Sequence, residues 1–128
     1  LGAEIVVDQK LAESDVVEIQ LTENGAKDPI FDGLGDKCLA IEGHKSSVKN
    51  LPEGTVHLAK TERCPINGFR YGKNAYGLQF HAELSRKDYL DRVALYPEYI
   101  DNTVNKDEEI LNSELVAKKI LENFAKLQ

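Results

Sequence analysis

The spacing of apolar residues changes its period along this chain, and that change limits the folds open to it. In residues 1–81 the apolar residues stand in short runs separated by turn residues, which predicts β-strands. Near the C-terminus they recur at intervals of three or four, which predicts an amphipathic helix. The apolar positions of that helix are Val116, Ala117, Ile120, Leu121, Phe124 and Leu127. We therefore expect an α/β fold that is strand-rich over 1–81, followed by helices over 86–95 and about 108–127.

The individual strands are expected at 4–7, 16–21, 38–42, 55–59, 67–70 and 76–80. The polar linker 8–15 suits a hairpin between the first two strands. Residues 24–36 include four glycine or proline residues, so they predict turns around an apolar plug of Ile30, Phe31 and Leu34. Residues 44–54 are expected to form a loop.

The helix over 86–95 has both of its ends marked. Ser85 is the expected N-cap, and Asp88 stands where the acid of a capping box belongs. Pro97 closes the segment. A polar loop is expected from there to about residue 107.

The bulk composition limits the classes of function. The chain has 128 residues, which suits one domain, and a net charge of −6 without a long Lys/Arg run. We therefore expect no nucleic-acid partner, and no apolar stretch is long enough to cross a membrane. Two cysteines are too few for a disulfide framework, which favours a cytoplasmic location. The lack of an initiator Met leads us to expect a fragment or a shortened start.

His81 and Glu83 are the strongest candidates for chemistry. They follow the strand at 76–80 and precede a helix start, and residues i and i+2 of an extended segment point the same way. A carboxylate there can hold one ring nitrogen of a histidine and leave the other free as a base. We expect the imidazole and the carboxylate to lie about 2.6–3.2 Å apart. His57, inside a strand, is expected to be structural.

Several ordered motifs carry a resemblance to a known family. The string Tyr76-Gly-Leu-Gln-Phe-His-Ala-Glu83 resembles the G-[VL]-Q-F-H-P-E signature of class I glutamine amidotransferases. Asp28-Pro-Ile-Phe-Asp-Gly-Leu34 is similar to the family's P-L-F-x-G-L segment. His44 to Gly54 is similar to S-H-G-D-x-V-x-x-L-P-E-G. Within the family, the chain looks most like the glutaminase domain or subunit of GMP synthase and its stand-alone relatives.

The resemblance implies a C-terminal half of a flavodoxin-like open sheet and a Cys-His-Glu triad, to which this chain gives His81 and Glu83. It also implies a substrate-side role for Gly43 and His44, in the loop that lines the glutamine pocket. No G-x-C-x-G elbow is present, and Cys38 and Cys64 are each expected to be an inert or surface thiol. The nucleophile would then lie in an N-terminal half that precedes residue 1, and the chain alone would be inactive. Ala82 replaces the family's proline, and Lys45-Ser46 replaces its Gly-Asp.

The implied partners are that N-terminal half, L-glutamine, and an ammonia-accepting synthetase domain or subunit. Two other readings stay open, namely a non-catalytic amidotransferase-like binding module and a γ-glutamyl hydrolase on the same fold. We expect no cofactor. We also expect no metal site, because the three histidines lack ligand spacing and no Cys-x-x-Cys pair exists.

Overall fold

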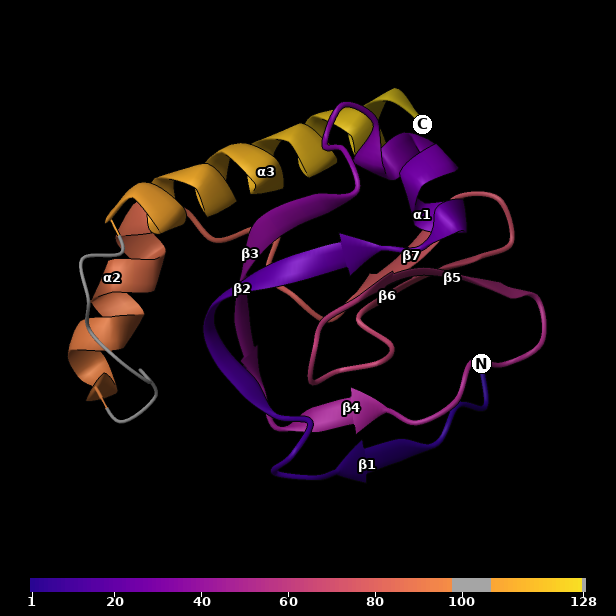
Figure 1. Cartoon of the computed structure of the whole chain (residues 1–128), viewed down its shortest axis with the longest axis horizontal. Coiled ribbons are helices and arrows are strands. Elements are labelled where there is room, and N and C mark those ends of the chain that lie inside the picture. Colours follow the sequence, from indigo (N-terminus) through magenta and orange to yellow (C-terminus); the bar gives the residue numbers. More distant parts are fainter. Residues whose placement is uncertain (98–106, 128) are drawn as a thin grey trace.

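The computed structural model describes residues 1–97 and 107–127, and its largest element is a five-stranded antiparallel sheet (Figure 1). The strand order is β3-β2-β5-β6-β7. The strands are β2 (Glu13–Leu21), β3 (Lys37–His44), β5 (Thr55–Lys60), β6 (Gly68–Tyr71) and β7 (Ala75–Leu78). The expected mixed α/β class is confirmed, and each of these strands overlaps a predicted one.

The predicted hairpin over 8–15 is wrong. β1 (Ile5–Val7) does not pair with β2 but forms a small antiparallel sheet with β4 (Ser46–Val48), inside the segment expected to be a loop. Two contacts of Glu4 with the segment after β4 accompany this pairing of β1. The Glu4 backbone N–H donates to the Asn50 side chain over 3.0 Å, and its carboxylate lies 2.8 Å from Nζ of Lys49.

The helices agree closely with the prediction. α2 (Arg86–Leu95) begins at the N-cap Ser85, and the capping box with Asp88 is present. α3 runs over Asp107–Lys126. The loop expected before α3 lies at 98–106, outside the described residues. Among the residues that the structure describes, no helix combines the length and apolarity of a membrane span.

Residues 24–36 are more ordered than the turn prediction allowed. α1 (Glu23–Lys27) begins at Thr22, whose hydroxyl accepts a hydrogen bond from the N–H of Gly25 over 3.0 Å. It is followed by a 3₁₀ turn, η1 (Pro29–Phe31). Gly25 is needed because a Cβ there would lie 1.9 Å from the carbonyl oxygen of Leu58 in β5. The absence of a side chain thus lets α1 lie directly on the sheet backbone.

The core lies between one face of the sheet and α3, which runs across β3 and η1 (Figure 1). Its buried apolar residues are Ile19, Ile30, Phe31, Ala40, Leu58, Ala59, Phe80 and Ile120. Two members of the predicted plug, Ile30 and Phe31, belong to it. The Nδ2 of Asn123 in α3 also donates to the carbonyls of Ile30 and Asp32, over 3.1 and 2.9 Å. A second cluster, of Ile41, Leu84, Tyr89 and Ile110, anchors α2 beside β3.

Candidate active site

His81 is held just beyond the end of β7 by a backbone contact with β3. Its N–H donates to the carbonyl of Ile41 over 2.8 Å, and the two residues form an isolated antiparallel bridge. The preceding Phe80 is buried in the main core. His81 therefore stands at a rigid point, with its side chain 25% exposed.

Glu83 lies within hydrogen-bond distance of His81, as the i, i+2 spacing predicts. The Nδ1 of His81 is 2.6 Å from Oε1 of Glu83. Partial burial acts to raise the pKa of the Glu83 carboxyl, but the hydrogen bonds from His81 and the backbone, with the charges of His81 and Arg92, together outweigh it and the pKa is lowered. Glu83 is thus kept as a carboxylate that fixes the tautomer of His81, so Nε2 stays free to accept a proton.

Gly43 of β3 lies against the free side of that imidazole. A Cβ built on Gly43 would be 3.2 Å from Nε2 of His81 and 3.6 Å from its Cδ2. Contacts of 3.4–4 Å are ordinary for a Cβ, so a side chain here would crowd the ring. The predicted residues Gly43 and His81 are therefore brought together where the segment after β7 meets β3.

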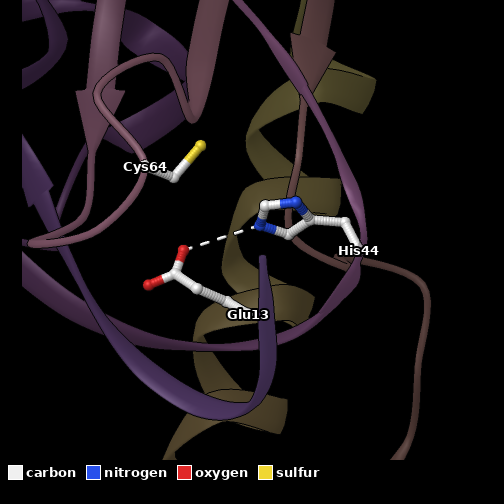
Figure 2. A group of neighbouring side chains, drawn as sticks. All are labelled: Glu13, His44 and Cys64. Atoms are coloured by element: carbon white, nitrogen blue, oxygen red, sulfur yellow. Dashed lines mark ion pairs between the residues drawn. The ribbon is translucent and has the colours of Figure 1, made fainter. Parts of the chain in front are cut away.

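His44 does not join them with its side chain. Its Nδ1 lies 3.1 Å from the carbonyl oxygen of Ser46, and its Nε2 faces two carboxylates. The Oε2 atoms of Glu13 and Glu42 are 3.5 and 3.7 Å from Nε2 (Figure 2 shows Glu13). The ring is only 5% exposed, so it is turned into this acidic cluster. A contact between His44 and a substrate would have to use the backbone.

Burial and charge act against each other inside that cluster. Desolvation acts to lower the pKa of His44, yet Glu13 and Glu42 outweigh it and the pKa is raised. Desolvation also raises the pKa of Glu42 to about 7, although the Asn67 side chain donates to it over 2.7 Å.

A cleft of about 910 Å³ opens beside His81 and Gly43. Its walls come from β2, β3, α2 and the segment before β6. They include Arg63 and Arg92, two positive charges of the kind that bind a carboxylate. The cleft has the size and mixed lining of a small-molecule site.

Comparison with known proteins decides the family. The family model described as "Glutamine amidotransferase class-I" matches residues 1–94. The chain belongs to this family.

Curated relatives of the chain are GMP synthase subunits. The chain is 38% identical over 79 residues to a subunit of the glutamine-hydrolyzing GMP synthase of Pyrococcus abyssi, a match that covers 61% of this chain and 40% of the relative. It is 35% identical over 94 residues to the corresponding subunit of Methanosphaera stadtmanae, covering 66% of this chain and 48% of the relative. The chain spans less than half the length of these two relatives.

Solved amidotransferase structures share the fold. A glutamine amidotransferase of Methylobacillus flagellatus superposes with a TM-score of 0.79 at 18% identity, and one of Thermotoga maritima with 0.72 at 21%. The superpositions cover 98% of this chain and 56% and 54% of the other chains. These likenesses establish the amidotransferase fold, which belongs to the flavodoxin-like class.

The two cysteines lack the properties of an amidotransferase nucleophile. Burial raises the pKa of Cys38 to about 11 and also raises the pKa of Cys64, which is fully buried. An activated thiol has a lowered pKa and an accessible sulfur. Neither side chain therefore has the accessible sulfur and lowered pKa of a catalytic nucleophile, and neither lies openly on the surface.

Sequence reasoning missed the acids around His44. Glu13 and Glu42 are 5% and 3% exposed. One signal was present, because Glu42 and His44 stand at i and i+2 of a strand, the same spacing that identified His81 and Glu83. Glu13 carries no local signal, since it meets His44 only through the pairing of β2 with β3.

Proposed function

We propose that this chain supplies the base and its orienting carboxylate to a glutaminase that releases ammonia from L-glutamine. The single observation that carries the proposal is the 2.6 Å contact between Nδ1 of His81 and Glu83 beside the cleft. His81 accepts the proton of a cysteine thiol at Nε2. The resulting thiolate attacks the side-chain amide carbon of glutamine.

The proton taken up by His81 then leaves on the amide nitrogen of glutamine. His81 returns it to the departing amine, ammonia leaves, and a thioester joins the cysteine to the γ-glutamyl group. Water, deprotonated by the same imidazole, opens the thioester and releases glutamate. Glu83 keeps the imidazole oriented through both halves of the cycle and stabilises its charged form.

The nucleophilic cysteine belongs, on this proposal, to an N-terminal half of the same domain. The raised pKa values of Cys38 and Cys64 support a source outside residues 1–128. Without that half the chain does not hydrolyse glutamine. Gly43, together with the backbone of His44, would lie on the substrate side of the site, because Gly43 faces Nε2 of His81.

The acceptor of the ammonia is proposed by analogy with the relatives. Both curated relatives named above are subunits of GMP synthase, so a synthetase subunit or domain is the proposed partner and the cytoplasm the proposed location. Arg92 lines the cleft and suits the α-carboxylate of glutamine, whereas the guanidinium of Arg63 already donates to the carbonyls of Gln9 and Lys10.

The test uses the assembled amidotransferase and measures ammonia release. His81→Ala should lower kcat by about 10²–10⁴-fold, the usual range for a lost general base. Glu83→Gln should cost less, because an orienting group contributes less than the base it holds. His57→Ala is the matched control, since His57 is half-buried in β5 and its Nε2 contacts the carbonyl of Ala59 at 2.9 Å.

Two outcomes would contradict these roles. Unchanged ammonia release in His81→Ala removes His81 from the mechanism and favours a non-catalytic binding module. A larger loss in Glu83→Gln than in His81→Ala reverses the assignment. Hydrolysis of γ-glutamyl peptides in preference to glutamine would identify a γ-glutamyl hydrolase instead.

A further inference from the structure

Three buried side chains from distant parts of the sequence meet beside the cleft. Glu13 begins β2, His44 ends β3, and Cys64 lies in the turn between β5 and β6 (Figure 2). One ligand-type atom from each lies within 4.8 Å of the other two. The mechanism proposed above uses none of these side chains.

In its neutral form, the His44 ring directs the lone pair of Nε2 towards the carboxylates of Glu13 and Glu42. Its Nδ1 lies 3.1 Å from the carbonyl oxygen of Ser46, and the neutral tautomer that donates to this carbonyl carries its ring proton on Nδ1. Nε2 then carries an unshared pair and faces Oε2 of both Glu13 and Glu42. Nε2 and Oε2 of Glu42 are both buried and have no hydrogen-bond partner among the described residues. Lone pairs that face one another in a buried site require a proton or a metal ion between them.

The distances favour a metal ion over a proton. The separation of 3.5 Å between Nε2 and Oε2 of Glu13 is long for a charge-assisted hydrogen bond. Two ligands of a tetrahedral zinc ion, each bonded at roughly 2.0–2.2 Å, stand about 3.3–3.5 Å apart. The spacing therefore fits two ligands of one ion. Imidazole nitrogen, thiolate sulfur and carboxylate oxygen are each ligand types that zinc accepts.

Surrounding groups hold the ligands in place. The Thr61 hydroxyl lies 2.8 Å from each oxygen of Glu13, and the same hydroxyl oxygen accepts from the N–H of Cys64. The contact between Nδ1 of His44 and a backbone carbonyl is the usual support of a metal-binding histidine. Such partners fix orientation before the ion arrives.

We propose that Glu13, His44 and Cys64 bind one zinc ion, with Glu42 beside it as a further oxygen ligand or charge. On binding, the Cys64 thiol loses its proton to the solvent and its sulfur forms the bond to zinc. The ion would join the start of β2, the end of β3 and the turn before β6. Because Gly43 precedes His44, it would also fix the strand segment that contacts His81. This proposal departs from the expectation of no metal site, which rested on spacing along the sequence alone.

The experiment measures metal binding, which does not depend on glutaminase activity. The protein, prepared together with the segment that completes its domain, is stripped with a chelator and dialysed against Zn²⁺. Elemental analysis should give one zinc per chain. With Co²⁺ as the probe, a thiolate-to-cobalt charge-transfer band should appear. Both signals should vanish in Cys64→Ser and persist in the matched control Cys38→Ser, which alters the other thiol.

A second pair of variants tests the nitrogen ligand. His44→Gln should lose stoichiometric zinc, and His57→Gln should keep it. Zinc should raise the Tm of the unaltered protein and leave that of His44→Gln unchanged. If Cys64→Ser fails to fold, the cobalt spectrum of the unaltered protein still reports whether a thiolate is bound.

Three results would overturn the proposal. One is the absence of stoichiometric zinc in the unaltered protein. Another is a cobalt spectrum without a thiolate band. The third is an imidazolium at His44, seen by ¹⁵N NMR as two protonated ring nitrogens that zinc does not displace, which would mean that a proton holds the cluster together.

Discussion

Gly43 offers a direct test of how closely the site is packed around His81. In Gly43→Ala the new Cβ would lie 3.2 Å from Nε2 of His81, against 3.4–4 Å for ordinary contact. The imidazole or β3 must therefore shift by a few tenths of an ångström. A misplacement of about 1 Å can cost roughly 10²-fold in rate, so a shift of this size should lower kcat by about three- to tenfold. That corresponds to about 1 kcal/mol of activation free energy.

Two assays separate this effect from a loss of stability. Ammonia release by the assembled enzyme gives kcat, and urea unfolding gives the free energy of unfolding. Gly72→Ala is the paired control, because Gly72 has φ 59° in the turn between β6 and β7 and a Cβ added there would meet nothing within 4 Å. An alanine with φ in this range should cost about 1 kcal/mol in stability and leave kcat unchanged.

The reasoning fails if Gly43→Ala and Gly72→Ala behave alike. Full kcat in Gly43→Ala would mean that Nε2 of His81 does not need the space above Gly43. Equal losses of stability with no difference in kcat would mean that β3 absorbs the methyl group away from the ring. The ¹⁵N shifts of the His81 ring give a check that does not depend on turnover.

Two further predictions concern the core and the pH. Ile120→Ala removes a fully buried side chain from α3 and should lower the free energy of unfolding, measured by urea titration, by about 2–5 kcal/mol. Its neighbour Leu121 is half-exposed, so Leu121→Ala should lower it by under about 1 kcal/mol. Equal losses in the two variants would refute the packing described for α3. Burial raises the pKa of Cys38 from 9.0 to about 11, so at pH 8 alkylation followed by mass spectrometry should be far slower in the folded than in the urea-unfolded protein. Because the folded state disfavours the thiolate, the contribution of Cys38 to the free energy of unfolding is present below about pH 9 and falls as the pH rises towards 11. Equal alkylation rates in the folded and unfolded protein would contradict the burial of Cys38.

Local patterns predicted local structure well. Ser85 and Asp88 are three residues apart, and the capping box they form depends on little beyond that spacing. His81 and Glu83 likewise meet because an extended backbone sets the direction of their side chains. The plug at Ile30 and Phe31 was visible from its flanking turn residues, although the short helices around it were not.

The features that the sequence did not predict depend on pairing between strands far apart in the chain. Residues 5–7 could have paired with any exposed strand edge; they pair with β4, and the contacts of Glu4 with Lys49 and Asn50 lie beside that pairing. The direction of the His44 ring depends on Glu13, which the β2–β3 register places directly opposite it. No periodicity within either strand carries that information.

The chain contains the same acid–histidine spacing twice, and exposure distinguishes the two cases. His81 and Glu83 are 25% and 63% exposed, and their contact of 2.6 Å leaves the other ring nitrogen at the cleft. The side chains of His44 and Glu42 are 5% and 0% exposed, and their separation of 3.7 Å is too long for a hydrogen bond. An exposed acid–histidine pair can exchange protons with a substrate. The charge of a buried pair must instead be balanced by a proton or an ion inside the protein. Since Gly43 lies between Glu42 and His44 and also touches His81, an ion bound by the buried pair would act on the position of the exposed one.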